Sequence, residues 1–140
     1  AYAVVKNTTL RNKLKKVMNG IVHHVGALGY TATLAAYKDG KSWHTALVKY
    51  LRQNRDHVEA NLSAHDRLTA YHSEATYLTW IDARNMNVDN PSTYFEKFGI
   101  GLYDGAPFGA PGFLRLNFAC PQSVLSEALK RINKGLEALT

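Results

Sequence analysis

The stretch "GFLRLNFACPQS", from Gly112 to Ser123, contains one residue whose type and position could do chemistry. Arg115 stands in the middle of an apolar run that leads to Cys120 and Pro121. A guanidinium offers two parallel N–H donors to a carboxylate, so an arginine here could hold an anionic group in a fixed orientation. The same pattern also allows the simpler interpretation that Arg115 is the solvent-facing residue of a half-buried strand.

The strand that would carry Arg115 follows from the alternation of this run. A period of two gives one apolar face and one mixed face, and the mixed face holds Phe113, Arg115 and Asn117. A Gly- and Pro-rich loop, "DGAPFGAPG", precedes the strand, and Pro121 opens a final helix. The predicted apolar stripe of that helix comprises Val124, Leu125, Ala128, Leu129, Ile132 and Leu136.

No other group of side chains in the sequence favours catalysis or metal binding. The histidines lack the spacing of a metal site: His23, His24, His44, His57, His65 and His72. Cys120 has no histidine–aspartate framework around it. Its place at a helix start could lower the pKa of the thiol, but a buried small residue is the better interpretation. The sequence therefore predicts no metal ligand and no catalytic residue in this chain.

Length and composition are those of one globular domain with a substantial core, at 140 residues with 46% hydrophobic and 20% charged side chains. The single cysteine indicates a reducing compartment. We find neither an apolar stretch of about 20 residues nor a signal peptide. These features predict a soluble, cytoplasmic protein without a membrane partner.

The formal net charge of +6 is concentrated near the N-terminus. One segment there contributes Lys6, Arg11, Lys13, Lys15 and Lys16. Apolar residues recur between them with helical spacing, which predicts an amphipathic helix with a basic outer face. A solvated face is a better interpretation than a nucleic-acid surface, because no zinc-finger, homeodomain or aromatic RNA-binding pattern accompanies it. We expect no nucleic-acid partner.

The first half of the chain is predicted to be mainly helical. "AYAVV" has the β-branched composition of a buried strand, and Asn7 is a suitable N-cap for a helix over residues 8 to 25. "GYTATLAAY" predicts a second helix, closed by a "KDGK" turn. Ser42 is then expected to cap a long helix of about 20 residues.

The periodicity changes after residue 65. "TYLTWID", residues 76 to 82, alternates as a strand does. Its Tyr77 and Trp80 are expected in the core, with a position in the cleft as the alternative. "DNPSTYFEKFG" predicts a short helix that is stopped by a glycine, and "IGLY" predicts another short strand. The resulting fold class is α+β, an α/β layer with helices on one face of a small sheet.

Three segments together carry a resemblance to a known family: "SEATYLTWIDAR", "FEKFGIGLYDGAPFGAPGFLRLNFACPQS" and the C-terminal helix. They resemble the C-terminal part of fold-type-I pyridoxal-phosphate-dependent enzymes, in the branch of the cystathionine β-lyase type of carbon–sulfur lyase and similar aminotransferases. The resemblance covers essentially the whole chain. It implies that residues 1–40 are the tail of the large cofactor-binding domain, 41–65 a connecting helix and 66–140 the small C-terminal domain.

The resemblance also implies a role for the arginine of the R-L-N strand. In this family that residue binds the α-carboxylate of the amino-acid substrate, and the matching position is Arg115. Phe108 and Gly109 of the preceding loop would border the pocket, with a plain surface connection as the alternative. One departure is Gln122, where many relatives have an arginine after Cys-Pro.

The implied cofactor is pyridoxal 5'-phosphate in the parent enzyme. The lysine that forms the Schiff base would lie upstream of "AYAVV", and Lys6 falls after that strand, so the cofactor lysine is not expected in this chain. The isolated chain is therefore predicted to be inactive. For the parent enzyme, the resemblance implies a homodimer. Three functions remain open: a carbon–sulfur β-lyase, an aminotransferase, and a non-enzymatic binding module.

Overall fold

The computed structural model describes residues 2–22 and 25–139. His23 and His24, two of the histidines considered above, lie outside the described residues, as does the first residue of "AYAVV". The chain divides into two compact units, Ala1–Ser42 and Trp43–Thr140. In the part that is described, none of the helices is both long enough and apolar enough to cross a bilayer.

The first unit contains two helices, α1 (Thr8–Met18) and α2 (Ala27–Asp39). The predicted N-cap is confirmed, because Asn7 Oδ1 accepts a 3.0 Å hydrogen bond from the backbone N–H of Leu10. The helix is shorter than predicted and ends at Met18, since the chain turns there with Gly20 in a left-handed conformation at φ +79°.

The strand predicted for "AYAVV" is wrong for its described residues. Residues 2–7 form neither helix nor strand, and the side chains of Tyr2 and Val4 are exposed. A β-branched segment becomes a strand only when a neighbouring strand pairs with its N–H and C=O groups. Within the first unit, no described segment provides that partner.

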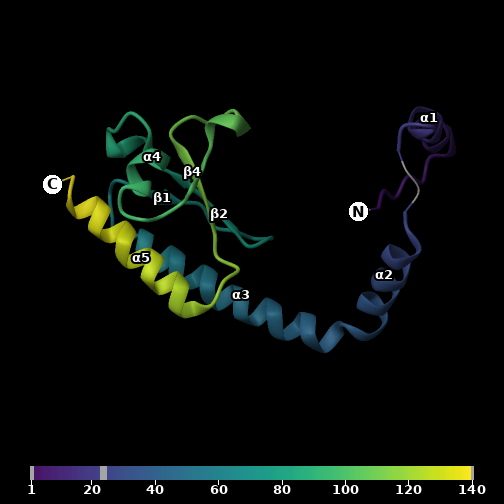
Figure 1. The fold of residues 1–140 in the computed structure, drawn as a ribbon, viewed down its shortest axis with the longest axis horizontal. Coiled ribbons are helices and arrows are strands. Elements are labelled where there is room, and N and C mark those ends of the chain that lie inside the picture. Colours follow the sequence, from purple (N-terminus) through teal and green to yellow (C-terminus); the bar gives the residue numbers. More distant parts are fainter. Residues whose placement is uncertain (1, 23–24, 140) are drawn as a thin grey trace. The chain divides into compact units, whose positions relative to one another are not determined.

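The second unit is built around three helices (Figure 1): α3 (Lys41–Leu62), α4 (Pro91–Glu96) and α5 (Gln122–Glu137). Helix α3 starts in the last residues of the first unit, and Ser42 lies inside its first turn instead of capping it. The cap predicted for α4 is confirmed, because Asn90 Oδ1 accepts a 2.9 Å hydrogen bond from the Thr93 N–H. Gly99, with φ +75°, ends that segment as expected.

Four antiparallel strands form one sheet in the order β1-β2-β4-β3. Their bounds are Thr69–Ala70 for β1, Leu78–Asp82 for β2, Tyr103–Asp104 for β3 and Phe113–Asn117 for β4. The central pair is β2 with β4, and Figure 1 shows these two strands crossing the middle of the unit. The strand predicted for "IGLY" keeps only its last residue, Tyr103, within β3.

One face of this sheet packs on α3 and α5. The buried residues of the two central strands are Thr79, Ile81, Leu114 and Leu116. The helices contribute Val58, Leu62, Leu125, Leu129, Ile132 and Leu136. Because these side chains form one hydrophobic cluster, the predicted α+β layer with helices on one face of a small sheet is confirmed for the second unit.

Candidate functional site

The face of the sheet opposite α3 and α5 carries one row of large side chains. Trp80 of β2 and Tyr103 of β3 are both direct partners of Arg115 in the pairing with β4. Residues that face one another across antiparallel strands project to the same side of the sheet. The three side chains therefore share the open face, with Arg115 in the centre.

Arg115 is held by aromatic rings. Its Cζ atom lies over the ring of Tyr103, 4.5 Å from the ring centre, and over the ring of Phe108 at 4.9 Å. The Nε atom is buried and has no hydrogen-bond partner among the described residues. Arg115 also takes part in none of the ion pairs that these residues form. Arg115 is thus a partly buried cation that lies over two rings and forms no ion pair with a carboxylate of the described residues.

Phe108 reaches Arg115 because the loop before β4 is tightly folded. A 3₁₀ turn, Ala106–Phe108, starts where the backbone N–H of Ala106 donates a 3.0 Å hydrogen bond to Asp104 Oδ1. A Cβ atom on Gly105 would collide with the backbone oxygens of Ala110 and Phe113, so only glycine fits there. The loop therefore has a defined backbone conformation, and its residues 106–109 are exposed.

A second arginine on this face has a different environment. Arg84 lies over the ring of Phe113, with 4.9 Å between its Cζ and the ring centre. Its Nε and Nη2 donate hydrogen bonds of 3.0 and 2.7 Å to the two oxygens of Asp82. These hydrogen bonds hold the pKa of Asp82 below its usual value. Arg84 is thus paired with an acid, whereas Arg115 is not.

The structure brings together two of the three residues predicted for the site. Arg115 and Phe108 are in contact, while Gly109 follows Phe108 in a left-handed conformation at φ +78° with open space where a Cβ would lie. Tyr103 is a residue of the site that the sequence does not identify. The pattern of "IGLY" predicts a strand that contains Tyr103, but it does not predict that this strand pairs with β4.

The core positions predicted for two aromatic residues are wrong. Tyr77 precedes β2 and is 47% exposed, and Trp80 is a partly buried residue of the open face. In β2 the residues that point into the core are Thr79 and Ile81, which places Trp80 on the other side. Trp80 stacks on Phe113 at 5.8 Å between ring centres.

The turn between β4 and α5 is fastened to α3. Asn54 Nδ2 donates hydrogen bonds to the backbone oxygens of Phe118 and Cys120, at 2.9 and 3.0 Å. The Tyr50 hydroxyl donates to the Cys120 oxygen at 3.2 Å and accepts from the N–H of Gln122 at 2.9 Å.

Burial raises the pKa of the Cys120 thiol, the opposite of the decrease that a helix start could cause. The Gln122 side chain is exposed, and nothing in the structure explains the departure from arginine.

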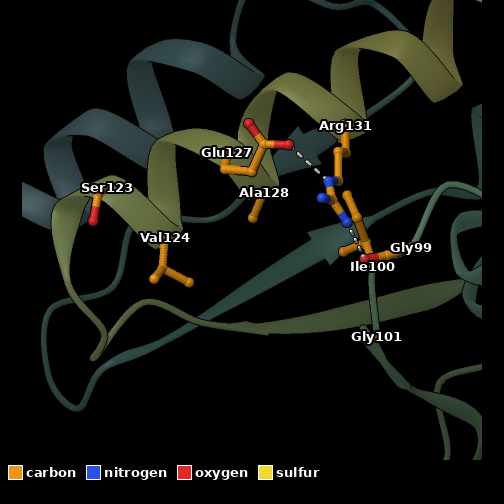
Figure 2. A pocket seen from close by; sticks show the side chains of 8 residues that line it. All are labelled: Gly99, Ile100, Gly101, Ser123, Val124, Glu127, Ala128 and Arg131. Carbon is orange, nitrogen blue, oxygen red and sulfur yellow. Dashed lines mark hydrogen bonds and ion pairs between the residues drawn. The ribbon is translucent and has the colours of Figure 1, made fainter.

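A groove of about 500 Å³ lies beside α5 (Figure 2), and Arg115 is not among the residues that line it. Arg131 crosses it and donates hydrogen bonds to Glu127 Oε1 at 2.9 Å and to the Gly99 oxygen at 3.2 Å. Val124 lines this groove and is exposed, so it does not belong to the buried stripe predicted for the helix. Because Arg131 is already paired with Glu127, the groove is a weaker anion site than Arg115.

Metal binding has no structural support in the described part of the chain. No three side chains of His, Cys, Asp or Glu in that part lie close enough together to hold a metal ion. The best-defined chemical feature is therefore a cation on an aromatic surface, an arrangement suited to a small carboxylate.

Comparison with known proteins adds the family and the extent of the match. A family model described as aminotransferase class I and II matches residues 1–132. The cystathionine beta-lyase of Corynebacterium glutamicum is 35% identical over 113 residues, which are 77% of this chain and 30% of that protein.

Solved structures agree with the architecture. The crystal structure of OvoB has a TM-score of 0.92 at 38% identity, over 95% of this chain and 35% of that one. Cystalysin from Treponema denticola, whose structure contains a pyridoxal 5'-phosphate cofactor, has a TM-score of 0.86 at 31% identity, over 98% of this chain and 36% of that one. The fold implied by the sequence resemblance is confirmed, and the chain spans about a third of the length of these proteins.

Proposed function

The chain belongs to the aminotransferase class I and II family, and we propose that it is the C-terminal part of a pyridoxal-phosphate-dependent carbon–sulfur β-lyase that acts on sulfur amino acids. The names of its relatives support this reaction, since they include a cystathionine beta-lyase and a pyridoxal-phosphate-containing cystalysin. An aminotransferase built on the same frame is the alternative.

The observation that carries the proposal is the environment of Arg115. Its partly buried guanidinium is ordered by two rings, and its Nε has no partner among the described residues. An amino-acid substrate brings an α-carboxylate, which accepts two parallel N–H bonds from a guanidinium. In the proposed function Arg115 binds and orients this carboxylate, and Phe108 and Gly109 border the pocket beside it.

The residues of the open face fit the substrate and not the cofactor itself. The four strands contain no lysine, so the sheet offers no covalent anchor for pyridoxal 5'-phosphate. We propose that this lysine lies in the part of the enzyme outside the chain. When bound, the cofactor supplies an electron sink for substrate chemistry. The contribution of Arg115 is then to fix the carboxylate, so that the α-carbon is held in one orientation.

Three further assignments belong to the same proposal. Residues 1–40 are the tail of the large cofactor-binding domain, 41–65 the connecting helix and 66–140 the small domain. The complete enzyme is proposed to be a homodimer. The single cysteine supports the cytoplasm as its compartment.

The product formed from cystathionine by the complete enzyme tests this function. A lyase converts cystathionine and water to pyruvate, ammonia and a thiol, and needs no 2-oxo acid. Turnover that requires an added 2-oxo acid would instead establish an aminotransferase. No turnover of either kind, together with tight binding of another molecule by the chain, would establish a binding module. The isolated 140-residue chain, mixed with the cofactor, is expected to turn over neither cystathionine nor cysteine.

A further inference from the structure

An arginine that binds a carboxylate must be both ordered and available. The free side chain has considerable rotamer entropy, which is lost when it is held in one position. An acidic neighbour would order it, as Asp82 orders Arg84, but would also occupy its donors. Arg115 is ordered in another way, because aromatic rings attract a cation without accepting its in-plane hydrogen bonds.

The two rings come from separate elements that are themselves fixed. Tyr103 is placed by the register of β3, in which it pairs directly with Arg115. Phe108 is placed by its 3₁₀ turn and by an edge contact with Trp80, with 6.0 Å between the ring centres. Trp80 is in turn stacked on Phe113. The rings are therefore supported from β2, β3 and β4 together.

Both rings are more than half exposed in this chain, 65% for Tyr103 and 56% for Phe108. Large aromatic side chains with that exposure add little to the core, and neither belongs to the hydrophobic cluster. Their contact with the guanidinium is thus their principal interaction on this face, apart from the edge contact between Phe108 and Trp80.

We propose that Tyr103 and Phe108 form an aromatic clamp that positions Arg115 and thereby sets the affinity of the site for the substrate carboxylate. This inference rests on the proposed function. Both members of the clamp are positioning residues, since they act through the guanidinium. The clamp keeps Arg115 in place before substrate arrives, which reduces the conformational entropy that binding would otherwise cost.

Phe108→Leu in the complete holoenzyme tests the clamp, because leucine keeps an apolar side chain but removes the ring. We expect kcat/KM for an amino-acid substrate to fall about 3- to 30-fold, mainly through KM. The dissociation constant of an α-methyl amino acid, measured by calorimetry, should rise by a similar factor. Phe108→Tyr retains a ring and should stay within about twofold of wild type. Tyr103→Leu and Tyr103→Phe repeat the comparison at the ring carried by β3, in case a Phe108 variant does not fold.

Two controls distinguish the loss of Arg115 positioning from a general disturbance of the protein. Tyr77→Leu removes a similarly exposed aromatic ring, and among the described residues the rings that lie over Arg115 are those of Tyr103 and Phe108. This variant should leave the dissociation constant unchanged. In an Arg115→Ala background, Phe108→Leu should cause no further loss, since the group that it positions is gone.

The outcomes distinguish the clamp from the function on which it rests. Normal kcat/KM in Arg115→Ala would overturn both. A large loss in Arg115→Ala with no loss in either leucine variant would overturn the clamp and leave the carboxylate site intact. The clamp is also refuted if Phe108→Leu causes the same loss with and without Arg115.

Discussion

The side-chain amide of Asn54 donates a 2.9 Å hydrogen bond to the backbone oxygen of Phe118, 64 residues further along the chain. The same amide reaches the oxygen of Cys120 at 3.0 Å, and Asn54 is fully buried. Helix α3 thus fixes the segment that follows β4. The strand β4, which carries Arg115, ends at Asn117, so this contact holds the chain directly after that strand.

Asn54→Ala should lower the free energy of unfolding by about 1–3 kcal/mol, because the buried backbone oxygen of Phe118 loses its donor and the Cys120 oxygen keeps only the Tyr50 hydroxyl. Midpoints of urea unfolding, followed by circular dichroism, measure the change. Gln53→Ala, at the exposed neighbouring position of the same helix, should change stability by no more than about 0.5 kcal/mol. Equal midpoints for the two variants would contradict the role of Asn54.

Arg115→Ala in the complete enzyme should reduce kcat/KM for amino-acid substrates by about 30- to 1000-fold, or about 2–4 kcal/mol, because the substrate carboxylate is left without its charged partner. Arg115→Lys should recover only part of the loss, since an ammonium lacks the two-pronged geometry. The absorbance of the bound cofactor should be the same in both variants. A surface arginine would leave kcat/KM unchanged.

Arg84→Gln should raise the pKa of Asp82 towards its usual value, because Arg84 is the main cause of its decrease. The pair stabilises the fold only while Asp82 is charged. Its contribution is therefore present well above the pKa of an unfolded aspartate, and it is lost as the pH falls through the lower folded-state value. Carboxyl titration of Asp82 by NMR, in wild type and variant, measures the shift. Identical titration curves would show that the hydrogen bonds do not set this pKa.

Cys120 should react slowly with thiol reagents in the folded protein. Burial raises the pKa of its thiol, so less thiolate is present at a given pH than for a free cysteine. Alkylation at pH 8 should be slower than that of a small-molecule thiol, and it should reach the small-molecule rate in denaturant. Faster reaction in the native state would point to an activated thiol.

Local signals in the sequence were sufficient for several parts of the fold. The caps at Asn7 and Asn90 depend on a side chain and a backbone N–H three residues away, so neighbouring residues determine them. The alternation around Arg115 likewise indicated which face of β4 is polar. The strand predicted for "AYAVV" is wrong because a strand needs a partner strand, and the composition of the segment does not reveal whether one is present.

The site was predictable only in part, for the same physical reason. Arg115 and Phe108 could be identified from a motif within one continuous stretch of chain. Tyr103 contacts Arg115 through the pairing of β3 with β4, which is a non-local property. The core position predicted for Trp80 is wrong because alternation predicts a strand but not which of its two faces is buried. The helices that cover Thr79 and Ile81 determine that face.

The strand order β1-β2-β4-β3 has a consequence for how the protein is made. During synthesis β2 leaves the ribosome long before β4, and until then its only partner in the sheet is the two-residue strand β1. One edge of β2 is therefore exposed to other nascent chains, and such edges promote aggregation. A chain interrupted before Phe113 keeps that edge permanently. The strand that carries Arg115 is thus also the strand that covers the exposed edge of β2 in the nascent chain.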